Sequence, residues 1–223
     1  MKLCERLAIE KGVTAVIGSG GKTTLLRCLG EELRQRGTVL LCTTTKVFPW
    51  ADLPCLLSPT EEEVSAALRE HGLICAGTLL PETGKLGPLD IPMARLAVWA
   101  DFVLVEADGS AQRPLKAHAS HEPVIPPESG QVLCVVGASG LDRPIREAAH
   151  RPALYAALAG IPEDAPASPE AAARVLKAEG LAGRYYINQA EGERRAPAKK
   201  LAGFLDRPVC FGSLQRGEWE CLQ

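Results

Sequence analysis

Short apolar runs alternate along the chain with segments whose apolar residues recur at helical spacing. Val13 to Ile17 is a β-branched run that ends at a glycine, and the segment from about Lys22 to Arg36 carries leucines along one helical face. Gly37 then ends this predicted helix, because glycine readily adopts the left-handed conformation of a helix terminus. Strands that alternate with amphipathic helices in this way predict a three-layer α/β fold with a mainly parallel sheet.

The same pattern predicts the other elements. Helices are expected at about 59–70, 169–180 and 197–205, and strands at 38–43, 102–105, 132–136, 185–187 and 209–211. The sequence Ser58-Pro59-Thr60-Glu61 supplies a capping box for the first of these helices, with proline at its first position. A segment rich in glycine and proline, 73–92, predicts a small β insertion of strand, turn and strand. We expect residues 1–223 to form a single domain that contains this insertion.

Composition and charge exclude several classes of partner. The 223 residues are 46% hydrophobic and 23% charged, which is typical of a globular protein with a sizeable core. A formal net charge of -2 provides no basic field for a nucleic acid backbone. Charges at Glu5, Arg6 and Glu10 interrupt any signal-peptide region, and no apolar run approaches the roughly 18 residues of a membrane span. We therefore expect a cytoplasmic protein that contacts neither nucleic acid nor membrane.

Cysteine and histidine patterns favour packing over metal binding. None of the eight cysteines stands at C-x-x-C spacing, and most lie in apolar segments, so we expect buried reduced thiols. His118, His121 and Glu122 lie close together in a proline-containing loop. Their order differs from that of the zinc proteases, and a loop of this kind is a poor scaffold for ligands, so metal binding is the weaker interpretation there.

A glycine-rich stretch, GSGGKTTLL, follows the first predicted strand and opens the first predicted helix. In such a turn, successive backbone N–H groups converge on an anion, and the helix N-terminus adds its partial positive charge. The full phosphate-loop pattern has a glycine six positions before the lysine, where this chain has Val16. The shortened form, G-x-x-G-K-T, resembles the loops of the Mur ligases. We therefore expect a P-loop NTPase-like nucleotide site formed by Gly18, Ser19, Gly20, Gly21, Lys22, Thr23 and Thr24.

The three residues after the glycines have separate expected roles. Lys22 is placed to reach the β- and γ-phosphates, the Thr23 hydroxyl to ligate Mg²⁺, and Thr24 to bond an α-phosphate oxygen. The alternative is a glycine-rich turn that only caps a helix. A simple helix cap does not explain why a strand precedes the turn, a helix follows it and the residues stand in the order G-K-T-T.

Acidic residues end a second predicted strand, in the stretch ADFVLVEADGS. Glu106 and Asp108 follow a continuous apolar run, at the edge of a parallel sheet where ligands bind. We expect them to complete a Mg²⁺ site with Thr23, one holding the metal and the other positioning water or a second substrate. The stretch TTTK, residues 43–46, ends another strand at the same edge and either faces the phosphates or simply suits a strand.

A third strand ends in the stretch INQAE, which resembles the N-K-x-D element of GTP-binding proteins. Asn188, Gln189 and Glu191 would then lie against a purine, with the Glu191 carboxylate accepting from guanine N1 and N2. Gln189 and Glu191 both depart from the element. A turn in which Asn188 bonds its own backbone accounts for the asparagine equally well. We expect either ATP or GTP to bind, with a slight preference for GTP.

Five stretches taken in order resemble one family. GSGGKTT, TTTKVF, VLVEADGSAQRPLKA, HEPVIP and INQAE, which together extend over most of the chain, resemble the selenium-dependent hydroxylase accessory proteins known as YqeC. The resemblance implies a P-loop protein that acts in the maturation of selenium-dependent molybdenum hydroxylases, with a hydroxylase or its maturation proteins as partner. Six further residues match the family pattern without an assigned role: Arg113, Lys116, His121, Glu122, His150 and Arg151.

Two functions remain open. The first is an NTP hydrolase or phosphotransferase that activates or phosphorylates a small molecule, with Arg113 and Lys116 stabilising the transferred charge. The second is a nucleotide-gated accessory protein, in which hydrolysis switches the loops at 43–46 and 106–110 and releases a partner or cargo. A structural module with a vestigial loop is a third, weaker interpretation.

Overall fold

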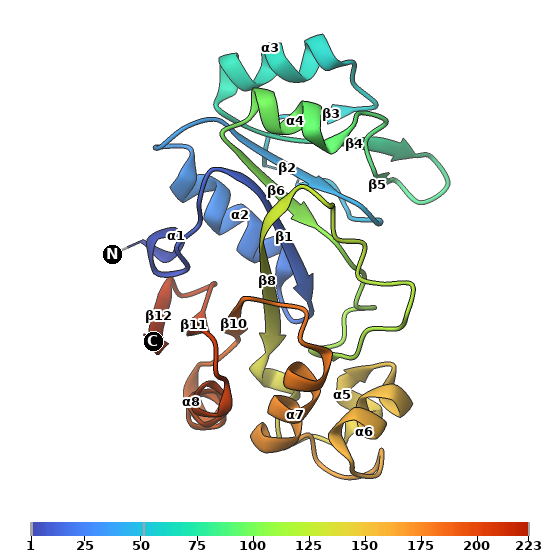
Figure 1. Ribbon diagram of the computed structural model, residues 1–223, viewed down its shortest axis with the longest axis vertical. Helices are drawn as coiled ribbons and strands as arrows, with labels where there is room; N and C mark the ends of the chain where they lie inside the picture. The colour runs from blue at the N-terminus through green and yellow to red at the C-terminus, as the bar shows by residue number, and fades with distance from the viewer. Residues whose placement is uncertain (1, 51, 223) are drawn as a thin grey trace. The chain divides into compact units, whose positions relative to one another are not determined.

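The computed structural model describes residues 2–50 and 52–222, which form two compact units (Figure 1). The first unit contains residues 2–16, 23–109 without position 51, and 124–131, and the second contains 17–22, 110–123 and 132–222. Each unit therefore collects segments that are distant in sequence. The prediction of a single domain stays a prediction.

The first unit is built on parallel strands in the order β1-β6-β2-β4-β3. All four neighbouring pairs in this order are parallel. The strands are β1 (Gly12–Gly18), β6 (Phe102–Glu106), β2 (Val39–Thr43), β4 (Leu73–Leu80) and β3 (Cys55–Leu57). Near-continuous apolar runs such as VLLCT and FVLVE are typical of strands that are buried on both faces, and the prediction of a mainly parallel α/β fold is confirmed.

Helices cover both faces of these strands. Leu40 and Val103 share a buried cluster with residues of α3 (Glu61–His71) and α4 (Met93–Trp99). The opposite face carries α2 (Lys22–Leu33), whose Gly30 lies against Leu41 and Leu73. Successive strand residues point to opposite faces, so Leu40 and Leu41 serve different layers. Figure 1 shows α3 and α4 together on one side of β2 and β6.

Two predictions for the first unit need correction. The capping box of α3 lies two residues later than expected. The Glu63 N–H donates to the Thr60 hydroxyl, and the Thr60 N–H donates to the Glu63 carboxylate. Ser58 instead accepts from the Leu79 backbone N–H at 3.2 Å. Only part of 73–92 forms the predicted hairpin, through antiparallel pairing of β4 with β5 (Lys85–Gly87). The start of β4 pairs in parallel with β2 and is a strand of the main sheet.

The second unit has strands in the order β8-β10-β11-β12. The first two pairs are parallel and the last is antiparallel. The strands are β8 (Ser129–Gly137), β10 (Arg184–Asn188), β11 (Val209–Ser213) and β12 (Glu218–Leu222), with a separate short pair of β7 (Leu115–Lys116) and β9 (Ala149–His150). The α-helices of this unit are α5 (Ile145–Ala148), α6 (Pro152–Ala159), α7 (Pro169–Glu179) and α8 (Arg195–Phe204). A further short helix, α1 (Leu3–Arg6), belongs to the first unit. Within residues 2–50 and 52–222, no helix combines the length and the hydropathy of a membrane-spanning segment.

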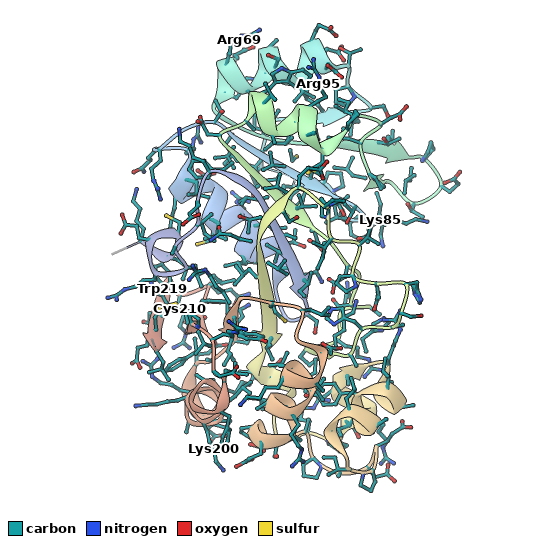
Figure 2. The ribbon with its side chains drawn as sticks, in the orientation of Figure 1. Arg69, Lys85, Arg95, Lys200, Cys210 and Trp219 are labelled. Carbon is teal, nitrogen blue, oxygen red and sulfur yellow. A yellow bond between two sulfur atoms is a disulfide. The ribbon has the colours of Figure 1, made fainter. Side chains whose placement is uncertain are left out.

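The last strand and its disulfide were not predicted. The last predicted strand ends at residue 211, whereas β12 returns beside β11 after the turn at Gly217. Cys210 and Cys221 are direct partners in this antiparallel register and form a disulfide (Figure 2). The expectation of eight reduced thiols is therefore wrong for this pair. The two cysteines are joined because the pairing of β11 with β12 places them opposite each other, and C-x-x-C spacing does not detect such a pair.

Candidate functional site

The glycine-rich loop that follows β1 lies in the second unit up to Lys22. The Ser19 backbone N–H donates to the Val135 carbonyl at 2.9 Å, which ties the loop to β8. Gly20 has a φ of 88°, and a Cβ there would lie 2.4 Å from the Gly137 Cα. Both the left-handed backbone and the close approach therefore require glycine at this position. The predicted arrangement of strand, glycine loop and helix is confirmed.

Two side chains of the loop are buried within it. The Lys22 ammonium donates to the Gly18 carbonyl at 2.7 Å, so the side chain folds back along the loop. Ser19 is 1% exposed, and among the described residues its Oγ has no hydrogen-bond partner. Burial of a hydroxyl without a partner costs about 1–3 kcal/mol. The loop thus contains a cation and a polar oxygen that suit a polar ligand.

The first unit contributes a threonine and a carboxylate that lie together. Thr23, in the first turn of α2, donates from Oγ1 to the Glu106 Oε2 at 2.9 Å. Trp50 fixes the same residue, because its indole N–H donates to the Thr23 carbonyl at 3.1 Å. Glu106 ends β6 and is 7% exposed, and Asp108, two residues later, is fully buried. Hydroxyl and carboxylate oxygens are the donors that Mg²⁺ prefers, so this pair fits the metal that the sequence predicts.

Threonines of the 43–46 stretch bind the same strand end. Thr43 donates from Oγ1 to the Glu106 carbonyl at 2.8 Å, and the Thr44 N–H donates to that carbonyl at 3.1 Å. The Thr44 hydroxyl donates to the Val124 carbonyl at 2.7 Å. These bonds commit Thr43 and Thr44 to the backbone around Glu106, while Lys46 is exposed. Thr24 is also exposed, on the first turn of α2.

Arg113 and Lys116 point to different partners within the second unit. The exposed Arg113 guanidinium donates to the Glu147 backbone carbonyl. Lys116 is buried, and its Nζ lies 2.9 Å from the Glu122 Oε1. These two contacts have no partner in common, so each of the two predicted charge-stabilising residues has its own anchor.

The base-recognition stretch is tied to the loop and to β11. Asn188 donates from Nδ2 to the Gly20 carbonyl at 2.8 Å and accepts at Oδ1 from the Leu214 N–H at 3.1 Å. Gln189 accepts from the Ser139 hydroxyl at 2.5 Å. The Glu191 Oε1 lies 3.9 Å from Arg194, and its buried Oε2 has no hydrogen-bond partner among the described residues. Asn188 therefore bridges two backbone segments, and a role for Gln189 and Glu191 at a base stays a prediction.

Two charged clusters in the second unit were not predicted. The Glu179 carboxylate Oε2 accepts from the His118 Nδ1 at 2.9 Å, and both side chains are buried. Arg151 binds the same Glu122 oxygen that receives Lys116. A cavity of about 10 Å³ is lined by Gly18, Ser19, Lys116, His118 and Tyr155, among others. The family resemblance included Lys116, Glu122 and Arg151. Their positions in the sequence did not indicate that Lys116 and Arg151 both bind Glu122.

Comparisons with known proteins give the family. The model of the family described as YqeC protein matches residues 14–153. A protein of Escherichia coli (strain K12) named "Uncharacterized protein YqeC" is 35% identical over 160 residues, which cover 69% of this chain and 62% of that relative. The chain thus spans less than two thirds of that relative's length. The crystal structure of the signal recognition particle 54 kDa protein from Aeropyrum pernix K1 in complex with GDP aligns with 96% of this chain and 44% of its own, at a TM-score of 0.46 and 16% identity. The family match extends over more than half of the chain, and the chain belongs to the YqeC family, as its ordered motifs predicted.

Proposed function

We propose that the chain binds a Mg²⁺-nucleotide, ATP or GTP, at residues 18–24 and uses the triphosphate to activate or phosphorylate a small molecule. The pathway we propose is the maturation of selenium-dependent molybdenum hydroxylases, and its support is the family resemblance. The observation that carries the nucleotide site is the bond of 2.9 Å between the Thr23 hydroxyl and the Glu106 carboxylate, directly after the glycine loop. A glycine loop that continues directly in sequence into a hydroxyl bonded to a carboxylate supplies the phosphate-binding and hard oxygen donors that metal-assisted phosphoryl transfer requires.

Each residue then has a proposed part. The loop N–H groups and the Lys22 ammonium would hold the phosphates, and Thr23 with Glu106 would hold the Mg²⁺, which neutralises charge that develops during phosphoryl transfer. Asp108 would position water or the second substrate. Thr24, Asn188, Gln189 and Glu191 keep their proposed contacts to the α-phosphate and the base. Arg113 and Lys116 keep the proposed role of stabilising transferred charge.

Calorimetry of Lys22→Ala tests the binding proposal. The variant should lose at least about tenfold in affinity for Mg-ATP and Mg-GTP, because a charge-assisted phosphate contact contributes more than 1.4 kcal/mol. Lys199→Ala removes the same charge from an exposed position on α8 and should bind as the parent does. Equal affinities in Lys22→Ala and the parent would remove Lys22 from the site and overturn the proposal.

A nucleotide-gated accessory protein is the alternative, and turnover separates the two. The loop after β2 is linked to the loop after β6, because Thr44 donates to the Glu106 and Val124 carbonyls and the Val124 N–H donates to the Ala107 carbonyl at 2.9 Å, so a ligand at Glu106 has a route to both. An enzyme would hydrolyse nucleotide rapidly once the second substrate is added. A gated protein would show slow hydrolysis that no small molecule accelerates, together with nucleotide-dependent capture of a partner.

A further inference from the structure

Four charged or titratable side chains of the second unit form one connected cluster. The Glu122 Oε1 accepts from Lys116 at 2.9 Å and also from the Arg151 Nη1. On its other side, the Arg151 Nη2 lies 3.4 Å from the His121 Nε2. Lys116 and Glu122 are nearly inaccessible, with exposed side-chain fractions of 1% and 10%, whereas Arg151 is 26% exposed. The cluster is therefore anchored inside the unit and accessible at its arginine.

The backbone holds the arginine in an unusual conformation. β7 and β9 pair Lys116 with His150, which places Arg151 directly after the pairing. Arg151 has a φ of 61° and precedes the first turn of α6, whose eight residues begin with Pro152. A left-handed conformation at a residue other than glycine costs about 1–2 kcal/mol, so the surrounding structure must hold it. The guanidinium of this residue contacts Glu122 and His121.

The guanidinium retains hydrogen-bonding capacity beyond these contacts. It carries five N–H donors in a rigid fork, and Glu122 occupies only one end of that fork. Among the described residues, Glu122 is the only acidic partner of Arg151, and one of the Glu122 oxygens is shared with Lys116. On its other side the guanidinium faces the His121 Nε2 at 3.4 Å, and because a guanidinium only donates, this nitrogen is the acceptor of any hydrogen bond between them. In the tautomer that carries a proton on Nε2, both groups are donors and an acceptor placed against both satisfies them.

We propose that Arg151 and His121 bind an oxyanion group, a phosphate or a carboxylate, of the second substrate, with Glu122 as the positioning residue that orients the guanidinium. The inference deepens the proposed function and rests on it, since it gives the second substrate its chemical class. Lys116 connects this oxyanion site to the nucleotide loop, because it also lines the small cavity that Gly18 and Ser19 line.

Nuclear magnetic resonance of the histidine rings tests the oxyanion site. The chain has four histidines, so the His121 signal is assigned by single substitution. Inorganic phosphate and acetate are titrated separately into the parent, with the loop saturated by Mg²⁺ and a non-hydrolysable nucleotide. The His121 signal should shift saturably, and Arg151→Gln should weaken the binding at least about tenfold, because bidentate arginine contacts are among the strongest available to an oxyanion. A response to phosphate alone, to acetate alone or to both identifies which oxyanion the site takes.

Arg146→Gln is the matched control. It removes the same charge from an exposed arginine on α5 that pairs with Asp164, and it should leave the titration unchanged. If Arg151→Gln does not fold, as judged by circular dichroism, Arg151→Lys retains the charge without the fork and should bind phosphate more weakly than the parent. The proposal is overturned if neither anion moves the His121 signal, or if the folded Arg151 variant binds the anion as tightly as the parent.

Failure of the proposed nucleotide binding can be distinguished from failure of the oxyanion site. Calorimetry of the parent with Mg-nucleotide precedes each titration, so an absence of nucleotide binding is detected by itself. In that case the same anion titrations on the nucleotide-free parent, Arg151→Gln and Lys22→Ala still judge the oxyanion site. Loss of anion binding in Lys22→Ala with retention in Arg151→Gln would assign the anion to the glycine loop and overturn the inference.

Discussion

Asn188→Ala should destabilise the second unit even when no nucleotide is present. The side chain donates to the Gly20 carbonyl at 2.8 Å and accepts from the Leu214 N–H at 3.1 Å, and it is only 7% exposed. The residue therefore holds the glycine loop and the segment after β11 in register with β10. A side chain that only recognised a base would leave the free energy of unfolding unchanged.

The magnitude follows from the two bonds. A typical intramolecular hydrogen bond contributes about 0.5–1.5 kcal/mol net, and a buried group that loses its partner costs about 1–3 kcal/mol. Alanine at position 188 leaves one carbonyl and one N–H without this partner, and water reaches such a site only in part. We expect the free energy of unfolding to fall by about 2–4 kcal/mol. Gln189→Ala is the matched control, since it removes a single bond between side chains and should cost less than about 1.5 kcal/mol.

Urea denaturation and hydrogen exchange together check this prediction. The urea midpoint reports the free energy of unfolding, and the exchange rate of the Leu214 amide reports the lost acceptor locally. In Asn188→Ala the Leu214 amide should exchange faster, whereas in Gln189→Ala it should not. An unfolding free energy within about 0.5 kcal/mol of the parent, with unchanged protection at Leu214, would refute the bridging role.

Further predictions concern acids and thiols of the first unit. The bond from Lys11 and the Thr38 N–H lower the pKa of the Asp101 carboxyl, so its stabilising contribution is present above the unfolded pKa of about 3.9 and is lost as the pH falls through the lower folded value. The urea midpoint of the parent should therefore fall more steeply below about pH 4 than that of Asp101→Asn, and parallel pH profiles would contradict this. The Cys75 thiol lowers the pKa of Cys55, whereas burial raises that of Cys28 and Cys42 to about 12. Iodoacetamide at pH 8 should accordingly label Cys55 before Cys28 and Cys42, as mass spectrometry would show, and Cys75→Ala should slow that labelling.

Local sequence signals were sufficient for the strand, turn and helix of the glycine-rich loop and for most of the sheet. A β-branched run that ends at glycine, followed by leucines at helical spacing, specifies a strand, a turn and a helix within about 25 residues. The glycines of the loop are required by backbone conformation at their own positions, as Gly20 illustrates. Glu106 was predictable for a similar reason, because a buried run that ends in acids places them at a known edge of a parallel sheet.

Elements stabilised by distant partners were harder to predict. β12 has alternating polar and apolar residues, EWECL, and is stable as a strand because β11 and the Cys210–Cys221 disulfide hold it. Its own pattern is too short to distinguish it from a loop. The start of α3 shows a related difficulty. Ser58 and Thr60 both resemble helix caps, and the choice depends on Leu79, whose N–H binds the Ser58 hydroxyl.

The charged residues of the family pattern show why side-chain roles need the fold. Arg113 and Lys116 stand three positions apart and were expected to act on the same transferred charge, yet one contacts a backbone carbonyl and the other a buried carboxylate. Glu122 forms ion pairs with Lys116 and Arg151, which lie on either side of it in sequence. The pairing of β7 with β9 brings these two residues close together. Periodicity and motif spacing describe neighbours along the chain, whereas the contact between the Glu122 carboxylate and the Arg151 guanidinium joins residues 29 positions apart. The sequence alone therefore supports a proposed ligand for the loop, whereas the proposed oxyanion site at Arg151 depends on contacts seen only in the folded second unit.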